Sequence, residues 1–429
     1  MRSILADGDL RLLRWLRVRE FAVPPLMIET ATARRTVGDW AGACAAARID
    51  VDLDPRAVAR VHGRELAALV RADLRHLAPD LLRWHLPRIA PDGLLRPGLT
   101  VALARYRPGP HLVVRTAPAW ADAGQRISLA LGGDASDRGG PHPHARPDRR
   151  FRLDLHRHLW DARRAGELPE RSGAATWRPS AGGLATHRWA AEAAILRRAA
   201  DRPGERVIVR VGNHRHLALD PDDPVPRSPS GPVRQRLLLP DASTWVLPDL
   251  ALLRAGLIEP GRLHPLVAAA LANYDETGVD VAINPAGAAA VVPGGAGSGL
   301  RLIECRGVRH RIGIVGGVLS ALDHDPAELR REAALVALGG VPLPCLRAID
   351  LAGREPAELD DVRGRLEHGD TAGALAVVEG LLGAAATLPD GALRDELDHA
   401  ARRRVTYGLY RAGLAGRGPL KTLPSSRRR

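Results

Sequence analysis

The change from helix to strand is marked by residues 99–115, which read LTVALARYRPGPHLVVR. Apolar residues tend to alternate with others over residues 99–106 and again over residues 111–115, and a Pro-Gly-Pro sequence lies between the two runs. A period of two is typical of a half-buried strand, and a Pro/Gly cluster between two such runs is typical of a turn. The stretch therefore predicts an antiparallel β-hairpin.

The sequence before this hairpin predicts helices instead. Apolar residues recur at helical spacing over residues 10–16 and again over residues 55–84. Asp54 directly before Pro55 predicts an N-cap followed by a proline in the first helical turn. We expect a helical N-terminal region over residues 1–92.

Strand patterns continue after the hairpin and then give way to helices. Residues 126–131 predict a third strand, residues 207–219 a second hairpin around Gly212-Asn213, and residues 300–322 a β-meander. Asp325-Pro326, with an acid at residue 328, resembles a capping box and predicts a helix start. The expected fold class is α+β, in which helical N- and C-terminal regions flank a central antiparallel β-meander region. Its expected parts are residues 1–92 (helical), 93–325 (β-rich, with loop insertions at 132–148 and 285–299), 326–415 (helical) and 416–429 (a basic disordered tail).

Composition sets the class of protein. A chain of 429 residues is long enough for two or three domains. The formal net charge is +13, but Lys421 is the single lysine among 62 basic residues, which is typical of a high-GC genome, and the arginines are spread among acids as on a solvated surface. We expect no membrane span and no signal peptide, because Asp7 and Asp9 interrupt the N-terminal apolar run.

The cysteines indicate the compartment. Cys44, Cys305 and Cys345 are odd in number, far apart and set among apolar neighbours, so we expect buried thiols in a reducing compartment and a cytoplasmic location.

Several reaction classes lack their motif. A P-loop needs a lysine after its glycines, and the one lysine lies in the tail, which excludes phosphate-loop NTPases. The sequence also has no His-Glu-x-x-His, no Cys-x-x-Cys and no Gly-x-Ser-x-Gly, so zincin, zinc-ribbon and serine-hydrolase functions are weakly supported. No motif identifies a cofactor.

Histidine pairs suggest a metal site. His-x-His occurs at 142/144, 156/158 and 214/216, and residues i and i+2 of a strand point to one face, where two imidazoles can bind one metal. His214 and His216 have the best strand context and are the predicted metal ligands. His156 and His158 would share a face if a strand began at Phe151.

A catalytic pair and a phosphate-binding surface are two further hypotheses. Asp323 and His324 lie where a strand enters a helix, and rigid strand ends position reactive groups, so they are the predicted catalytic pair. For nucleic acid, the predicted contacts are two arginine clusters, which would bind phosphates in a salt-sensitive way. These clusters are Arg402, Arg403 and Arg404, and Arg427, Arg428 and Arg429.

Taken as a whole, the chain resembles an uncharacterised family of high-GC actinobacterial cytoplasmic proteins. The resemblance is carried by residues 151–160, 245–256, 304–326 and 369–383, and it implies a bacterial cytoplasmic setting with no activity to transfer. Since no catalytic constellation is complete, we expect a non-catalytic adaptor or scaffold that binds a protein partner. A metal-dependent hydrolase using His/Asp residues of the β-rich domain and sequence-nonspecific nucleic-acid binding are the alternatives.

Overall fold

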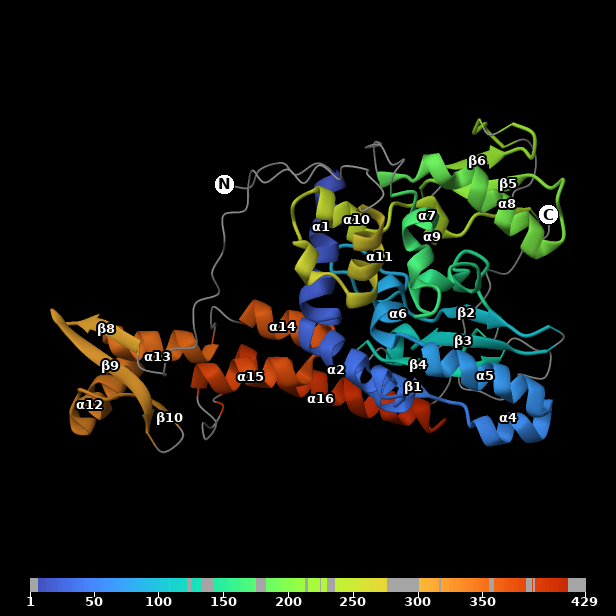
Figure 1. Ribbon diagram of the computed structural model, residues 1–429. Coiled ribbons are helices and arrows are strands. Elements are labelled where there is room, and N and C mark those ends of the chain that lie inside the picture. Colours follow the sequence, from blue (N-terminus) through green and yellow to red (C-terminus); the bar gives the residue numbers. More distant parts are fainter. Residues whose placement is uncertain are drawn as a thin grey trace, which may run out of the picture. The chain divides into compact units, whose positions relative to one another are not determined.

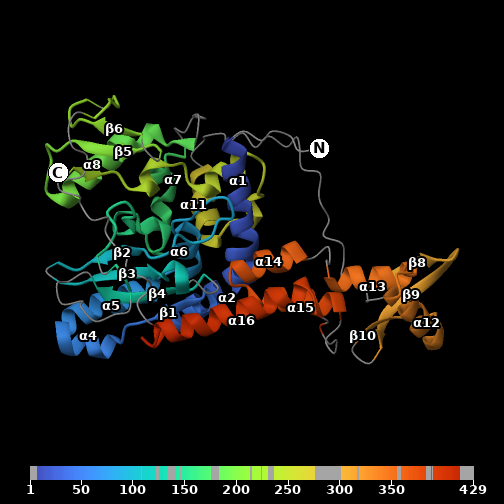
Figure 2. The ribbon, with the colours of Figure 1, turned by 180° about the vertical axis from the view of Figure 1, so that it is seen from behind.

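The structure is a computed structural model, and the residues that it describes fall into two units. Unit 1 comprises Met1–Ala288 with Tyr410–Arg429, and unit 2 comprises Ala289–Leu409. Both contain helices and strands (Figures 1 and 2), so the predicted α+β class is confirmed. The described residues are 7–107, 109–121, 125–132, 142–144, 146–174, 183–212, 215–223, 225–229, 236–275, 301–315, 318–354, 359–382, 388 and 390–415.

Unit 1 begins with six helices, as its sequence predicts. The helix from Pro55 is capped by Asp54, whose carboxylate accepts from the backbone N–H groups of Arg56 (2.9 Å) and Ala57 (3.2 Å). The six are α1 (Asp7–Arg17), α2 (Pro25–Thr36), α3 (Trp40–Ala46), α4 (Pro55–His62), α5 (Arg64–His76) and α6 (Pro79–His85). Further along the chain unit 1 contains α7 (Leu168–Ser172), α8 (Trp189–Ala200), α9 (Asp241–Thr244), α10 (Pro248–Arg254) and α11 (Pro265–Asp275).

The predicted hairpin is the centre of the main sheet of unit 1. Strands β2 (Thr100–Arg105) and β3 (His111–Thr116) pair antiparallel, and β4 (Ile127–Gly132) is the predicted third strand. The sheet order is β1-β4-β3-β2, in which β1 (Ile49–Val51) pairs with β4 in parallel. This parallel strand was not predicted, because three residues between two helices are too few to display a period of two.

A second sheet of unit 1 contains the other predicted hairpin. Strands β5 (Val207–Arg210) and β6 (His216–Leu219) pair antiparallel, and β7 (Leu237–Leu238) adds to β5 in parallel. The strand considered from Phe151 is absent, since Leu153–Leu155 and Arg157–Leu159 form two short 3-10 turns.

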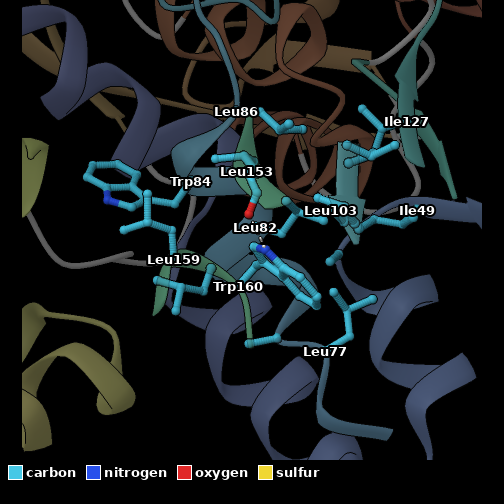
Figure 3. Close-up of a cluster of buried hydrophobic side chains, with 14 of the residues drawn as sticks. Ile49, Leu77, Leu82, Trp84, Leu86, Leu103, Ile127, Leu153, Leu159 and Trp160 are labelled. Atoms are coloured by element: carbon cyan, nitrogen blue, oxygen red, sulfur yellow. Dashed lines mark hydrogen bonds between the residues drawn. The ribbon is translucent and has the colours of Figure 1, made fainter. Parts of the chain in front are cut away.

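One buried cluster joins the helices of residues 1–92 to the main sheet. It contains Val70 of α5, Leu103 of β2, Ile127 of β4 and the indole of Trp160. Figure 3 shows part of it, in which Trp160 Nε1 donates to the carbonyl of Leu153 (3.0 Å). The predicted boundary at residue 92 therefore does not separate two cores, because the helices bury their apolar faces on the sheet that follows them.

Unit 2 holds the predicted meander followed by helices. Strands β8 (Arg301–Cys305), β9 (Val308–Val315) and β10 (Val318–Ala321) pair antiparallel in the order β10-β9-β8. Since meander and following helices belong to one unit, the predicted boundary at residue 325 falls inside it. The helices are α12 (Pro326–Ala337), α13 (Pro344–Arg354), α14 (Leu359–Glu367), α15 (Thr371–Leu382) and α16 (Ala392–Arg411, whose last two residues belong to unit 1).

Candidate metal centre

Cys305 is positioned by a tight turn between β8 and β9. Arg306 and Gly307 both have positive φ, 52° and 80°, as a two-residue hairpin turn requires, and glycine adopts this conformation without strain. Cys305 is paired with Val308 across the turn, so its side chain lies on the same face of the sheet as that of His310. Cys305 is fully buried on that face.

His324 lies in the short connection between β10 and α12. The predicted N-cap at Asp325 is confirmed, because its carboxylate accepts from the backbone N–H of Ala327 (2.9 Å). A strand end on one side and a capped helix on the other hold the intervening residue in place. The side chain of His324 is 3% exposed.

Cys345 is the second residue of α13. This helix packs on the meander, and Cys305, Ala321, Leu343 and Cys345 form the buried cluster between them. The first turn of a helix favours negative charge, so the position suits a thiolate.

These three side chains converge. One ligand atom from each of Cys305, His324 and Cys345 lies within 4.8 Å of the other two, and all three residues are buried. In a tetrahedral zinc site, bond lengths of about 2.3 Å to sulfur and 2.0 Å to nitrogen place the ligand atoms about 3.5–3.8 Å apart. A contraction of roughly 1 Å would therefore bring the three atoms to coordination distance.

The two ring nitrogens of His324 have different surroundings, as in histidines that bind a metal. Its Nε2 is buried and has no hydrogen-bond partner among the described residues, whereas its Nδ1 lies 3.5 Å from Glu328 Oε2, in the first turn of α12. Histidines that bind metal through one nitrogen commonly donate from the other to a carboxylate. Glu328 is thus placed to orient the ring.

A second imidazole accompanies the cluster. The ring centroid of His310, on β9, lies 4.1 Å from that of His324, and His310 Nδ1 is also buried with no hydrogen-bond partner in the described part of the chain. Buried polar atoms in native proteins are nearly always paired, so two unpaired ring nitrogens in adjacent imidazoles point to a missing partner. His310 is not one of the three residues whose ligand atoms lie within 4.8 Å of one another, but its ring contact with His324 makes it the candidate fourth ligand.

The thiols influence each other. Burial, together with a hydrogen bond to Cys305 and the nearby charge of Asp323, raises the pKa of the Cys345 thiol to about 11. A bound transition metal would oppose this effect, because a coordinating thiol is deprotonated outright.

The two members of the predicted catalytic pair, Asp323 and His324, face different partners. Both carboxylate oxygens of Asp323 face Arg311, accepting from its backbone N–H (2.6 Å) and its guanidinium (2.7 and 3.0 Å). These hydrogen bonds lower the pKa of Asp323 to about 2. Asp323 therefore ties the connection before α12 to strand β9, while His324 turns towards the cysteines.

Of the two predicted metal ligands, His214 and His216, the structure describes His216. His216 is the first residue of β6, is half-buried and pairs with Arg210, whereas His214 lies outside the described residues. Asp220, just beyond the strand, forms an ion pair with Arg206.

His156 belongs to a buried polar network instead, whereas His158 is buried beside it with no hydrogen-bond partner for either ring nitrogen among the described residues. His156 Nε2 lies 2.7 Å from Ser243 Oγ and 3.1 Å from Glu192 Oε2, and Arg171 donates to both oxygens of Glu192 (2.8 and 3.0 Å). Burial favours the protonated carboxyl, but the hydrogen bonds from His156 and Arg171 outweigh it and hold the pKa of Glu192 well below its usual range. Serine, histidine and acid do not form a relay here, because serine and acid share one ring nitrogen and the serine is fully buried.

The predicted phosphate-binding arginines are on α16. Arg402 and Arg404 are exposed and Arg403 is half-buried, and consecutive helical residues point about 100° apart, so the three do not form one face. Arg427, Arg428 and Arg429 lie outside the described residues.

Sequence reasoning missed both cysteines of the centre. It required a Cys-x-x-Cys pair, whereas here each ligand comes from a different element. The available signals were a cysteine and a histidine five residues apart in a predicted hairpin, a histidine just before a helix cap, and Pro344-Cys345 at a predicted helix start.

Comparisons with protein-family models, curated proteins and solved structures found no match. The resemblance to an actinobacterial family therefore stays a prediction. Among the described residues, no helix combines the length and apolar character needed to cross a membrane.

Proposed function

We propose that residues 301–354 bind one Zn²⁺ ion through Cys305, Cys345 and His324, with His310 as the fourth ligand. The observation that carries the proposal is the convergence of two buried thiols and a ring nitrogen of the buried His324 within 4.8 Å. The ion would link the end of β8, the connection before α12 and the start of α13.

The ligand set selects the type of metal. Thiolate and imidazole favour zinc and other soft or borderline ions, whereas Mg²⁺ and Ca²⁺ prefer oxygen ligands. The first turn of α13 favours the negative charge of a thiolate at Cys345. Glu328 lies at Nδ1 of His324, where a carboxylate orients a histidine that binds metal through its other nitrogen.

The size of the local core favours a structural role. Counting described side chains only, the buried apolar cluster between the meander and α13 consists of Ala321, Leu343 and the two cysteines themselves, with partly buried neighbours such as Ile303 and Ile349. Such a small core contributes little to folding, and small modules of this kind commonly depend on a metal. With two Cys and two His ligands the coordination shell would be closed, as in structural zinc sites.

Metal analysis of the purified full-length chain tests the proposal. Protein produced with added zinc and dialysed without chelator should contain about one Zn²⁺ per chain, and the variant Cys345→Ser should contain less than half of that. Cys44→Ser is the matched control, because Cys44 is also fully buried but belongs to unit 1. It should keep its full zinc content.

A metal-free wild-type protein that also fails to take up zinc on reconstitution would overturn the proposal. If Cys345→Ser does not fold, Co²⁺ titration of the wild-type chain decides, since cobalt bound to thiolates shows sulfur-to-metal charge-transfer absorption. Absence of that absorption would equally contradict the assignment.

The adaptor role and a cytoplasmic location stay predictions beside this proposal. Unit 2 exposes Leu335, Leu338 and Val341 at the end of α12 and just after it, with exposed fractions of 54%, 87% and 89%. Exposed apolar side chains close together are a common feature of protein-binding surfaces. Native mass spectrometry of the protein isolated gently from its host would show whether a stoichiometric partner accompanies it.

A further inference from the structure

Unit 1 contains a cavity of about 340 Å³ that is separate from the zinc centre. It is bounded by one face of α1, by the residues that follow α6, by residues 150–153 and by residues 241–248. Leu86, Leu153 and Leu159 line part of it, and they belong to the apolar cluster shown in Figure 3. The volume lies at the lower end of the range for small-molecule sites.

The lining of this cavity carries an excess of positive charge. Among the described residues of the lining, six arginines contribute to it and Asp241 is the one carboxylate. Asp241 is engaged by Arg150 (2.7 Å), and Arg152 is engaged by Asp154 outside the cavity (2.7 Å). The remaining four, Arg11, Arg14, Arg88 and Arg96, have no carboxylate within ion-pair distance among the described residues. Both terminal nitrogens of Arg11 and of Arg88 donate to backbone carbonyls, which hold these two guanidinium groups in place.

Unsatisfied donors lie in the same lining. The Nε atoms of Arg14 and Arg88 and the indole Nε1 of Trp15 are buried and have no hydrogen-bond partner in the part of the chain that the structure describes. All three atoms are N–H donors, so they require an acceptor. Burial lowers the pKa of Arg11 to about 10 and that of Arg88 to about 9, and repulsion from Arg14 adds to both shifts. An anion in the cavity would relieve this repulsion.

Flat apolar surfaces adjoin these donors. The indoles of Trp15 and Trp245 and the ring of Phe151 line the cavity, and the guanidinium of Arg11 lies over Trp245 at 5.4 Å from the ring centroid. Aromatic and guanidinium planes commonly stack on nucleobases. The site thus combines donors for a phosphate with surfaces for a planar ring.

We propose that this cavity binds a nucleoside monophosphate, with the phosphate on Arg14, Arg88 and the Trp15 N–H and the base against the aromatic side chains. A phosphate monoester offers three acceptor oxygens in a tetrahedral arrangement, which suits donors from different directions better than the two coplanar oxygens of a carboxylate. The volume is of the size of one small ligand such as a nucleotide. Binding, not hydrolysis, is inferred.

Titration calorimetry of the full-length chain at low salt tests this proposal. AMP should bind saturably with one site per chain, and adenosine and inorganic phosphate should each bind at least about tenfold more weakly, since each lacks half of the contacts. Arg14→Gln should weaken AMP binding by about tenfold or more while leaving adenosine binding unchanged.

Arg71→Gln is the matched control, because Arg71 is exposed on α5 and does not line the cavity. It should bind AMP as the wild type does. If circular dichroism shows that Arg14→Gln is unfolded, Trp15→Phe takes its place, since it keeps a ring but removes the indole N–H, and a weakening of severalfold is expected.

Three results would overturn the proposal. The first is the absence of saturable AMP binding, and the second is equal loss in Arg14→Gln and Arg71→Gln. The third is binding of short single-stranded DNA as tightly as AMP with no dependence on Arg14 or Trp15, which would indicate phosphate binding on the protein surface.

Discussion

His324 Nδ1 lies 3.5 Å from Glu328 Oε2, and one ring nitrogen of His324 lies within 4.8 Å of the thiols of Cys305 and Cys345. His324 directly precedes the N-cap Asp325, and Glu328 lies in the first turn of α12, so the contact joins the connection before the helix to the helix itself. The imidazole therefore has a carboxylate and two thiols as neighbours, as in carboxylate–histidine–metal arrangements.

Replacing Glu328 should weaken zinc binding without removing a ligand. In Glu328→Gln the ring of His324 loses the carboxylate that fixes its orientation, so zinc affinity should fall by about 10- to 100-fold. Competition with a chromophoric chelator measures this change.

Glu332→Gln is the control for that experiment. Glu328 and Glu332 both accept from the guanidinium of Arg306, at 2.9 and 2.7 Å, but only Glu328 lies beside His324. Equal losses of affinity in the two variants would assign the effect to Arg306 and contradict an orienting role for Glu328.

Removal of zinc should loosen unit 2 selectively. If the ion links β8, α12 and α13, chelation should increase amide hydrogen exchange over residues 301–354 by at least about tenfold. The main sheet of unit 1, β2 to β4, serves as the internal control and should exchange as before. Uniform exchange before and after chelation would mean that the meander does not depend on a metal.

Stability should fall in mild acid because of His85. Burial lowers the pKa of this imidazole to about 4, and the charge of Asp249, 3.8 Å away, opposes the shift only in part, while His264, Arg19 and Arg88 add to it. An unfolded histidine titrates near 6.5, so the unfolded state binds more protons between the two values and is favoured as the pH falls. Between pH 6.5 and 4 this group should remove about 3 kcal/mol from the free energy of unfolding.

Denaturant midpoints across this pH range test that prediction. His85→Gln should show a shallower dependence on pH than the wild type, and replacement of the exposed His62 in the same way should leave the dependence unaltered. Parallel curves for His85→Gln and wild type would show that other groups cause the acid sensitivity.

Glu192 should be important for the stability of unit 1. Its carboxylate accepts from Arg171 (2.8 Å) and Ser243 (2.8 Å), and Arg171 is 16% exposed, so Glu192→Gln would leave a largely buried cation without its counter-charge. We expect a loss of about 3 kcal/mol in the free energy of unfolding. The exposed Glu170→Gln should change it by less than about 0.5 kcal/mol. An equal loss of unfolding free energy in both variants would contradict a stabilising role of the network around Glu192.

Local patterns determined most of the elements before any contact was known. The hairpin over residues 99–115 appears as β2 and β3, the caps at Asp54 and Asp325 form as expected, and the helix predicted to start at Pro326 is α12. Each of these features depends on residues within a few positions of one another. The three-residue strand β1 was not predicted from local patterns, because its pairing with β4 depends on residues about 80 positions away.

The candidate site depended on distance in space, which the sequence does not contain. The residue types were visible, and His324 was singled out, but its predicted partner Asp323 turns to Arg311 while Cys305 and Cys345 approach from β8 and α13. Whether a strand-end residue faces inward or outward is set by how α12 and α13 pack on the meander. The sequence by itself therefore determined the strands, helices and caps, whereas only the tertiary structure decided which thiols and imidazoles meet, because those contacts arise from packing between elements far apart in the chain.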